Sequence, residues 1–274
     1  MIMKTLNQYI QEKLIINKDY HDNKIVVKSF NELKKIIVDR YYKLGPGTKE
    51  NPIDFNDIDV SNIDSFCNHE YTGIFETGIF ESIKFKYIDI SYWDVSNATD
   101  MEVMFYECDE LESIGDLSYW DVSKVTNMSS MFYNCKALKT IGDISGWDVS
   151  KVTHMSRMFY ECKSFNQDLS SWNVSSVTDM RGMFARCLSF NKGLSDWDVS
   201  NVTDMENMFL NCKNFNQDLS GWDVSSVTNM AYMFNLCISF NQDLSGWDVS
   251  KVKSKTRAFL NCPIKRKYKP KFKK

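Results

Sequence analysis

Residues 147–170 read WDVSKVTHMSRMFYECKSFNQDLS, and close variants of this string recur along most of the chain. The seven tryptophans follow one another at intervals of 27, 27, 25, 25, 25 and 25 residues. They are Trp93, Trp120, Trp147, Trp172, Trp197, Trp222 and Trp247. A cysteine stands fifteen residues after each of them, from Cys108 to Cys262. So regular a period predicts that each repeat is one structural unit packed against the next.

Within one repeat, two short elements are expected. Met155, Met158, Phe159 and Cys162 stand at i, i+3, i+4 and i+7, which predicts one apolar stripe of a short helix. Thr153 precedes the stripe, where its hydroxyl would cap the helix start. Residues 165–170 predict a short strand that stacks in parallel with its equivalents, about 4.8 Å apart. The predicted fold class is therefore an α/β repeat solenoid, with short parallel strands on one face and short helices on the other.

The string W-D-V-S-x-V-T-x-M-x-x-M-F-x-x-C-x-x-F-N-x-x-L-S resembles the BspA-like leucine-rich-repeat family, in its mycoplasma-type subfamily of unknown function. The resemblance covers residues 93–262 closely and residues 55–92 loosely. It implies a leucine-rich-repeat-like solenoid and a surface or secreted role in adhesion and protein binding. It implies no catalytic residues.

The repeats divide the chain into three parts. Residues 1–54 are expected to form a helical N-terminal cap, with one helix over residues 4–13 and another from the capping box Ser29-Phe-Asn-Glu32 to about Lys43. Residues 55–262 are the solenoid of about eight repeats of 25–27 residues. Residues 263–274 are a basic C-terminal tail.

Most of the repeated polar and sulfur-bearing residues have structural explanations. The closest cysteines are 25 residues apart, which excludes CxxC-type metal spacing, so buried thiols are favoured over oxidation between rungs or metal binding. The methionine and tryptophan columns are expected in the core. Two columns of aspartates, such as Asp143 and Asp148, favour turn capping, with a calcium ladder or an acidic recognition face as alternatives. The three histidines share no motif, and no enzyme signature occurs. We therefore expect neither an enzyme nor a cofactor.

Charge is strongly segregated along the chain. Residues 249–274 carry eleven Lys or Arg and no acid, while the other 248 residues carry 22 basic and 36 acidic groups. Cations interleaved with Tyr268 and Phe272 suit weak contact with nucleic acid or an anionic surface. A solubilising end cap, or a tail folded back on the acidic body, is the alternative. The candidate residues are Lys265, Arg266, Lys267, Lys269, Lys271, Lys273 and Lys274.

The N-terminus lacks the unbroken apolar core of a signal peptide, and no stretch is long enough to span a bilayer. A cytoplasmic protein is expected on this ground, whereas the family resemblance implies association with a surface or a virion.

The predicted function is a non-enzymatic protein-interaction or adhesion module that binds a macromolecular partner. Alternation along residues 165–170 and their equivalents selects the candidate contacts. These are Asn166, Asp168, Ser170, Asn216, Asp218, Ser220, Asn241, Asp243 and Ser245. The alternative is a structural component of a virion or envelope, anchored by the basic tail.

Overall fold

The computed structural model describes residues 24–68 and 77–272. The helix expected over residues 4–13, and Lys273 and Lys274, lie outside the described residues. The regular elements gather near the N-terminal end and pair in twos: β1 (Ile25–Val26) with β3 (Ile58–Asp59), and β2 (Ile53–Asp54) with β6 (Ile88–Asp89), both parallel. β4 (Cys67–Asn68) pairs antiparallel with β5 (Thr77–Gly78). One α-helix, α2 (Phe30–Leu44), and one short 3-10 helix, η1 (Arg266–Tyr268), complete the described elements.

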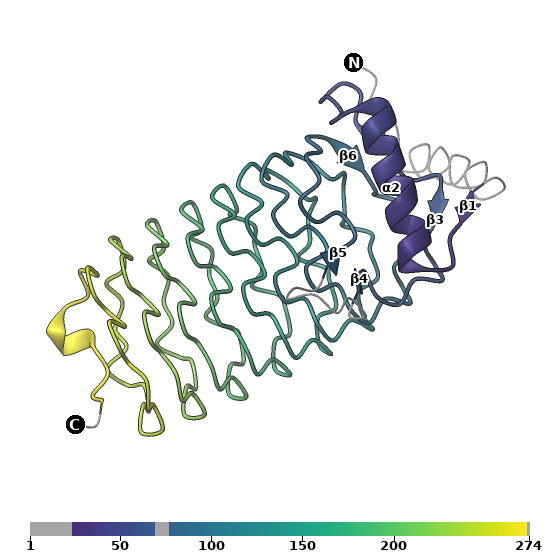
Figure 1. Cartoon of the computed structure of the whole chain (residues 1–274). Helices are drawn as coiled ribbons and strands as arrows, with labels where there is room; N and C mark the ends of the chain where they lie inside the picture. Colours follow the sequence, from purple (N-terminus) through teal and green to yellow (C-terminus); the bar gives the residue numbers. More distant parts are fainter. Residues whose placement is uncertain (1–23, 69–76, 273–274) are drawn as a thin grey trace, which may run out of the picture.

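Helix α2 begins and ends where the sequence predicts. The Ser29 hydroxyl accepts the backbone N–H of Glu32 at 3.3 Å, and Gly45 ends the helix with a φ of 77°. Leu33 and Ile37 are buried, so this face of α2 covers the first part of the stack (Figure 1). Arg40 adds a two-pronged ion pair to Asp57, at 2.7 and 2.6 Å. The prediction of a helix from Ser29 to about Lys43 is confirmed.

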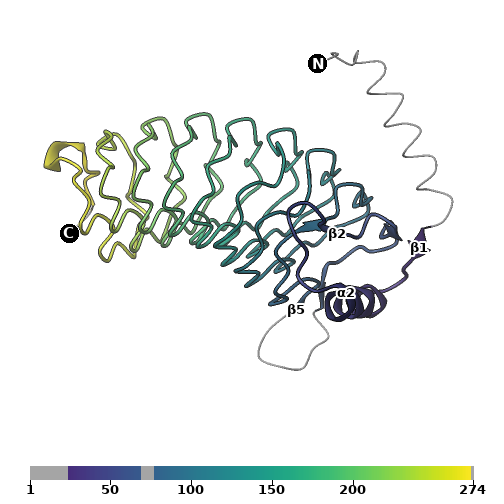
Figure 2. The ribbon, with the colours of Figure 1, turned by 90° about the horizontal axis from the view of Figure 1, so that it is seen from above.

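After α2 the chain winds through successive coils that lie side by side along one axis (Figures 1 and 2). Single parallel β-bridges connect equivalent residues of neighbouring coils. They run through Asp100, Asn127, His154, Asp179, Asp204, Asn229 and Ser254. Since these residues are 27 or 25 positions apart, each sequence repeat forms one coil.

The short helix expected over residues 155–162 does not form. The backbone N–H groups of Met155, Arg157 and Phe159 donate to carbonyls of the next coil, at 3.0, 2.6 and 3.0 Å, instead of to the preceding helical turn. Between them, Met158 N–H bonds to Met155 C=O, which closes a tight turn. Arg157 has a φ of 55°, as the third residue of a type II turn requires. Consecutive tight turns thus bury the same four apolar side chains that a helix would have buried.

The prediction of a strand over residues 165–170 is also wrong. This segment is joined to the next coil by a side-chain hydrogen bond and not by backbone pairing. Asn166 Oδ1 accepts the backbone N–H of Asn191 at 2.9 Å, so no backbone ladder forms there. Thr153 does not cap a helix either. Its hydroxyl donates to Thr126 C=O of the preceding coil at 3.2 Å, and the other threonines of the column repeat this bond. Parallel pairing occurs one corner away, at the bridges described above.

The core is a set of columns of identical side chains. Phe132, Phe159 and Phe184 stack with ring centroids 5.7 and 6.0 Å apart and planes within 9°. The indole N–H of Trp172 donates to Ile144 C=O at 2.9 Å, and the other six tryptophans make the equivalent bond. Cys187 Sγ donates to Phe159 C=O at 2.9 Å in the same manner. The tryptophan side chains are buried, as are the methionines of residues 101–233, which confirms their prediction as core.

The residues with positive φ in the tight turns allow the backbone conformation of the coils to be tested by substitution. Gly182 occupies with a φ of 60° the position that Arg157 occupies one coil earlier. We expect Gly182→Ala to lower the free energy of unfolding by about 1–2 kcal/mol, since a Cβ disfavours this conformation. Gly221→Ala is the matched control, because its Cβ would meet no atom within 4 Å. Urea denaturation measures both, and equal effects would contradict the turn geometry.

The described part of the basic tail closes the last coil. Leu244 N–H donates to Tyr268 C=O at 2.8 Å, and Lys265 N–H donates to Asn241 Oδ1 at 3.0 Å. Ile264 and Pro270 are buried against the coil. The described part of this segment is therefore packed on the last coil, where the Ser245 hydroxyl lowers the pKa of Asp243 and Lys267 also lies close enough to that carboxyl to lower its pKa.

Candidate interaction surface

Exposed aspartates form two columns that flank the tryptophan corner of the coils. We call these residues the acidic ridge. One column holds Asp116, Asp143, Asp168, Asp218 and Asp243, and the other holds Asp94, Asp121, Asp148, Asp198, Asp223 and Asp248. Because one coil follows another, the ridge runs along the stack, with Gly193 interrupting the first column and Asn173 the second.

Each carboxylate of the acidic ridge is fixed by its own turn. Asp168 Oδ1 accepts the backbone N–H of Ser170 at 3.0 Å, and Asp223 Oδ1 accepts that of Ser225 at 2.9 Å. The same Asp-x-Ser bond recurs along both columns. Asn173 occupies one ridge position and makes the equivalent bond at 3.2 Å. The preference for turn capping is therefore confirmed, and an amide supports the turn as a carboxylate does.

These bonds also keep the ridge charged. Hydrogen bonds from the Ser145 hydroxyl and backbone N–H lower the pKa of Asp143 below its ordinary value. The backbone N–H and hydroxyl of Ser170 lower the pKa of Asp168 in the same way. Donors favour the ionised form of a carboxyl. The ridge carboxyls whose pKa is lowered in this way are Asp121, Asp143, Asp148, Asp168, Asp198, Asp223 and Asp243.

The nine predicted contact residues divide into three groups. Asp168, Asp218 and Asp243 belong to the acidic ridge and are exposed. The three serines Ser170, Ser220 and Ser245 donate the N–H groups that fix those carboxylates. The three asparagines Asn166, Asn216 and Asn241 accept backbone N–H groups of the following coil or of the cap, and therefore join coils together.

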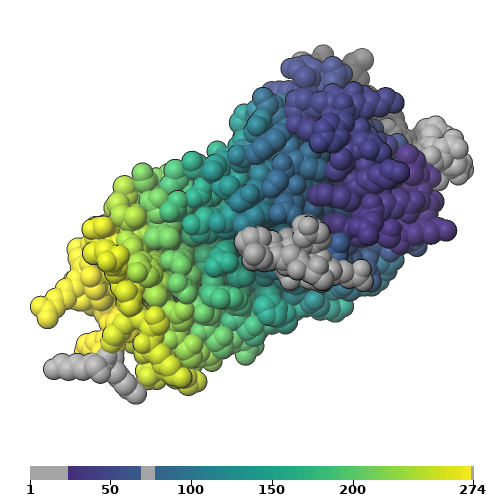
Figure 3. Space-filling model, in the orientation of Figure 1, coloured from purple at the N-terminus to yellow at the C-terminus, as the bar shows by residue number. Residues whose placement is uncertain are grey.

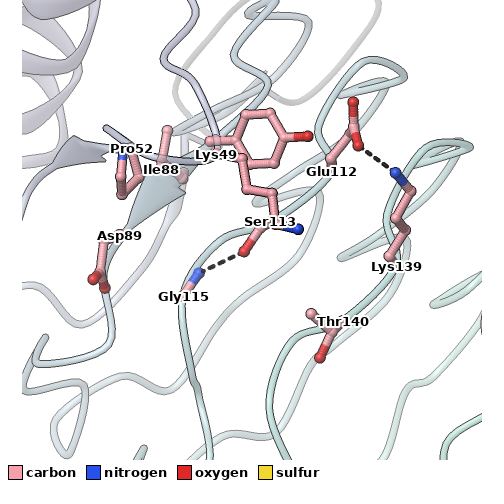
Figure 4. A pocket seen from close by; sticks show the side chains of 10 residues that line it. Lys49, Pro52, Ile88, Asp89, Glu112, Ser113, Gly115, Lys139 and Thr140 are labelled. Atoms are coloured by element: carbon pink, nitrogen blue, oxygen red, sulfur yellow. Dashed lines mark hydrogen bonds and ion pairs between the residues drawn. The ribbon is translucent and has the colours of Figure 1, made fainter.

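A hollow of about 410 Å³ lies beside the acidic ridge near the N-terminal end (Figure 4). It lies at the two coils whose repeats are 27 residues long, two more than the later repeats. These coils carry an additional column of parallel bridges, from Tyr87 to Ser113 and from Ser113 to Thr140. Glu112 and Lys139 at its rim form an ion pair. A hydrogen bond to Glu112 raises the pKa of the Tyr87 hydroxyl. The hollow was not predicted, although the change from 27- to 25-residue repeats marks its place in the sequence.

The chemistry of the cysteines is set by burial. Cys108, Cys135, Cys162, Cys187, Cys212 and Cys237 are buried free thiols. Burial raises the pKa of the Cys108 thiol to about 12, which removes the reactive thiolate at neutral pH. Among residues 24–68 and 77–272, no cluster of three His, Cys, Asp or Glu could hold a metal ion. No helix of the described chain is long and apolar enough to cross a membrane.

Comparison with known protein families places most of the repeats in one family. The model of a family described as Mycoplasma protein of unknown function, DUF285, matches residues 75–196 and 179–267. The two overlapping matches together span more than half of the chain and coincide with the coils. No curated protein and no solved structure matches the chain.

Proposed function

We propose that this chain, which belongs to the Mycoplasma family of unknown function DUF285, is a non-enzymatic module that binds a protein partner, as an adhesin or interaction protein does. The proposal extends to the finer resemblance, in which the stack of coils is a solenoid related to BspA-like leucine-rich repeats. Repeat arrays of this kind use their extended surfaces for binding.

The observation that carries the proposal is the acidic ridge. Its carboxyl groups are exposed and held by Asp-x-Ser turns, so binding would order few additional side chains. Preorganised contacts bind more tightly because less conformational freedom is lost. In the space-filling view the coils close into one continuous surface, as an extended contact needs (Figure 3).

The charge of the acidic ridge selects the partner. A protein surface with several lysines or arginines would match the regular carboxylates and be steered toward them. Such binding weakens as salt is added, because exposed charges are screened over about 8–10 Å at physiological ionic strength.

The test compares the chain with Asp168→Asn/Asp218→Asn/Asp243→Asn. Asparagine keeps the acceptor that fixes each turn, as Asn173 shows, and removes only the charge. Both proteins would be immobilised at equal density and used to capture proteins from a Mycoplasma lysate at low and high salt. We expect a saturable protein that the unchanged chain retains and the triple variant loses.

A control variant removes three acids away from the acidic ridge, Glu50→Gln/Glu107→Gln/Glu110→Gln, so that the net charge changes equally. Equal capture by the unchanged chain and the ridge variant, or no saturable capture by either, would contradict the proposed function.

A further inference from the structure

The C-terminal end of the stack differs from the rest of the surface in both charge and apolar exposure. Within residues 249–274 every charged side chain is basic. The cations of the last coil and cap whose side chains are exposed form a set that we call the cationic end. Its members are Lys251, Lys253, Lys255, Arg257, Lys265, Arg266, Lys267 and Lys271.

The cationic end extends over more than one side of the last coil, partly beside and partly away from the last two members of the acidic ridge, Asp243 and Asp248. Lys265 lies at one side, where its N–H bonds to Asn241. Lys255 lies over the Phe272 ring at 5.3 Å, and Arg257 lies over Tyr232 at 5.9 Å, at another corner of the coil. The charges are therefore spread over an area and do not follow a single line.

Exposed aliphatic side chains border the same end. Leu236, Ile238 and Leu260 are 38%, 58% and 44% exposed, which is unusual for large apolar residues in this chain. Leu236 N–H bonds to Leu260 C=O at 2.9 Å, so the last two coils hold these residues next to each other. Clustered apolar side chains beside basic ones are typical of proteins that bind at a membrane interface.

We propose that the cationic end docks the protein on the surface of an anionic phospholipid bilayer, with Leu236, Ile238 and Leu260 entering the interface. Each Lys or Arg near such a surface contributes about 1 kcal/mol. A bilayer presents phosphates over an area, as the spread of cations requires. The stack would then stand on the membrane by its C-terminal end and project its remaining coils away from it.

Nucleic acid fits these observations less well. Binding of single strands uses aromatic rings as stacking platforms for bases. The rings of the cap are occupied, because Tyr268 lies under Lys265 and Lys267, and Phe259 lies under Lys269. Exposed leucine and isoleucine side chains have no partner on a phosphate backbone, whereas the lipid interface receives them.

The proposal does not rest on the acidic ridge, and its experiment is separate. Full-length protein would be sedimented with vesicles of phosphatidylcholine containing 30% phosphatidylglycerol, and with vesicles of phosphatidylcholine alone, across a salt series. The main variant is Lys253→Gln/Arg266→Gln/Lys271→Gln. The matched control is Lys151→Gln/Lys163→Gln/Lys213→Gln, whose lysines are also exposed but lie on middle coils.

We expect the unchanged chain to bind the anionic vesicles only. The main variant should have a partition coefficient onto these vesicles that is lower by on the order of a hundredfold, because each of the three lost cations contributes about fivefold. The control should change by less than about threefold. Tryptophan fluorescence would verify that both variants remain folded. Equal losses in the two variants, or equal binding to neutral vesicles, would overturn the proposal.

A second pair of measurements separates lipid from other polyanions. Leu260→Asn/Ile238→Asn should weaken vesicle binding about tenfold or more, because less apolar surface is buried in the interface. The same variant should bind a short duplex DNA, used as a polyanion without an apolar phase, as tightly as the unchanged chain does. If this variant binds vesicles as the unchanged chain does, while the DNA competes fully, the cationic end is a general polyanion site and the membrane proposal is wrong.

Discussion

Phe184→Ala is expected to lower the free energy of unfolding by about 3–5 kcal/mol. Phe184 is fully buried and lies between Phe159 and Phe209, at centroid distances of 6.0 and 5.8 Å, with Phe190 only 4.2 Å away. Truncation leaves a cavity in a column whose neighbours are fixed by bonds between coils, so the site cannot collapse to fill it.

Urea denaturation followed by tryptophan fluorescence measures this loss. Lys163→Ala, an exposed substitution on the preceding coil, should change the free energy of unfolding by less than about 0.5 kcal/mol. A loss below about 1 kcal/mol for Phe184→Ala would mean that the aromatic column does not hold the coils together.

The second large effect is alkaline unfolding caused by the buried thiols. Burial raises the pKa of Cys108 to about 12, and it also raises the pKa values of Cys135, Cys162, Cys187, Cys212 and Cys237. In the unfolded chain these thiols ionise near pH 8.5. The folded state is therefore at full stability below about pH 8.5, and it loses stability as the pH rises toward the folded pKa values.

Each such thiol costs about 1 kcal/mol between pH 9 and pH 10, so six together lower the free energy of unfolding by about 6 kcal/mol. Denaturant titrations at each pH measure this slope. In Cys187→Ala the slope should be shallower by about one sixth, even though the variant is less stable at pH 7. An unchanged slope in the variant would show that other groups control the alkaline transition.

The repeat unit, the buried columns and helix α2 could be predicted from the sequence. The backbone conformation within a coil could not. Met155, Met158, Phe159 and Cys162 fall on one side both in a helix and in consecutive tight turns, so periodicity alone cannot distinguish the two. A run of eight residues is also too short for a stable helix. The distinguishing signal lies at the positions between them, where Gly182 and Asn207 favour positive φ.

The sequence alone distinguishes only some of the predicted contact residues from residues that have a structural role. The Asp-x-Ser spacing of Asp168 and Ser170 indicates a local turn, and the structure shows that turn. The role of Asn166 could not be read in the same way, because its partner Asn191 belongs to the next coil. The proximity of the exposed Leu260 and Leu236 could not be read from the sequence, because the bond that joins them runs between two coils.

The bonds between coils have a consequence for how the protein changes over generations. Thr178 donates to the coil before it and Met180 to the coil after it, and neighbouring 25-residue repeats offer the same donors and acceptors in the same register. Loss or duplication of one such repeat in frame would leave each new junction chemically matched. The distance between the two ends of the protein can therefore vary among descendants in steps of about 4.8 Å, while the ends themselves are inherited intact.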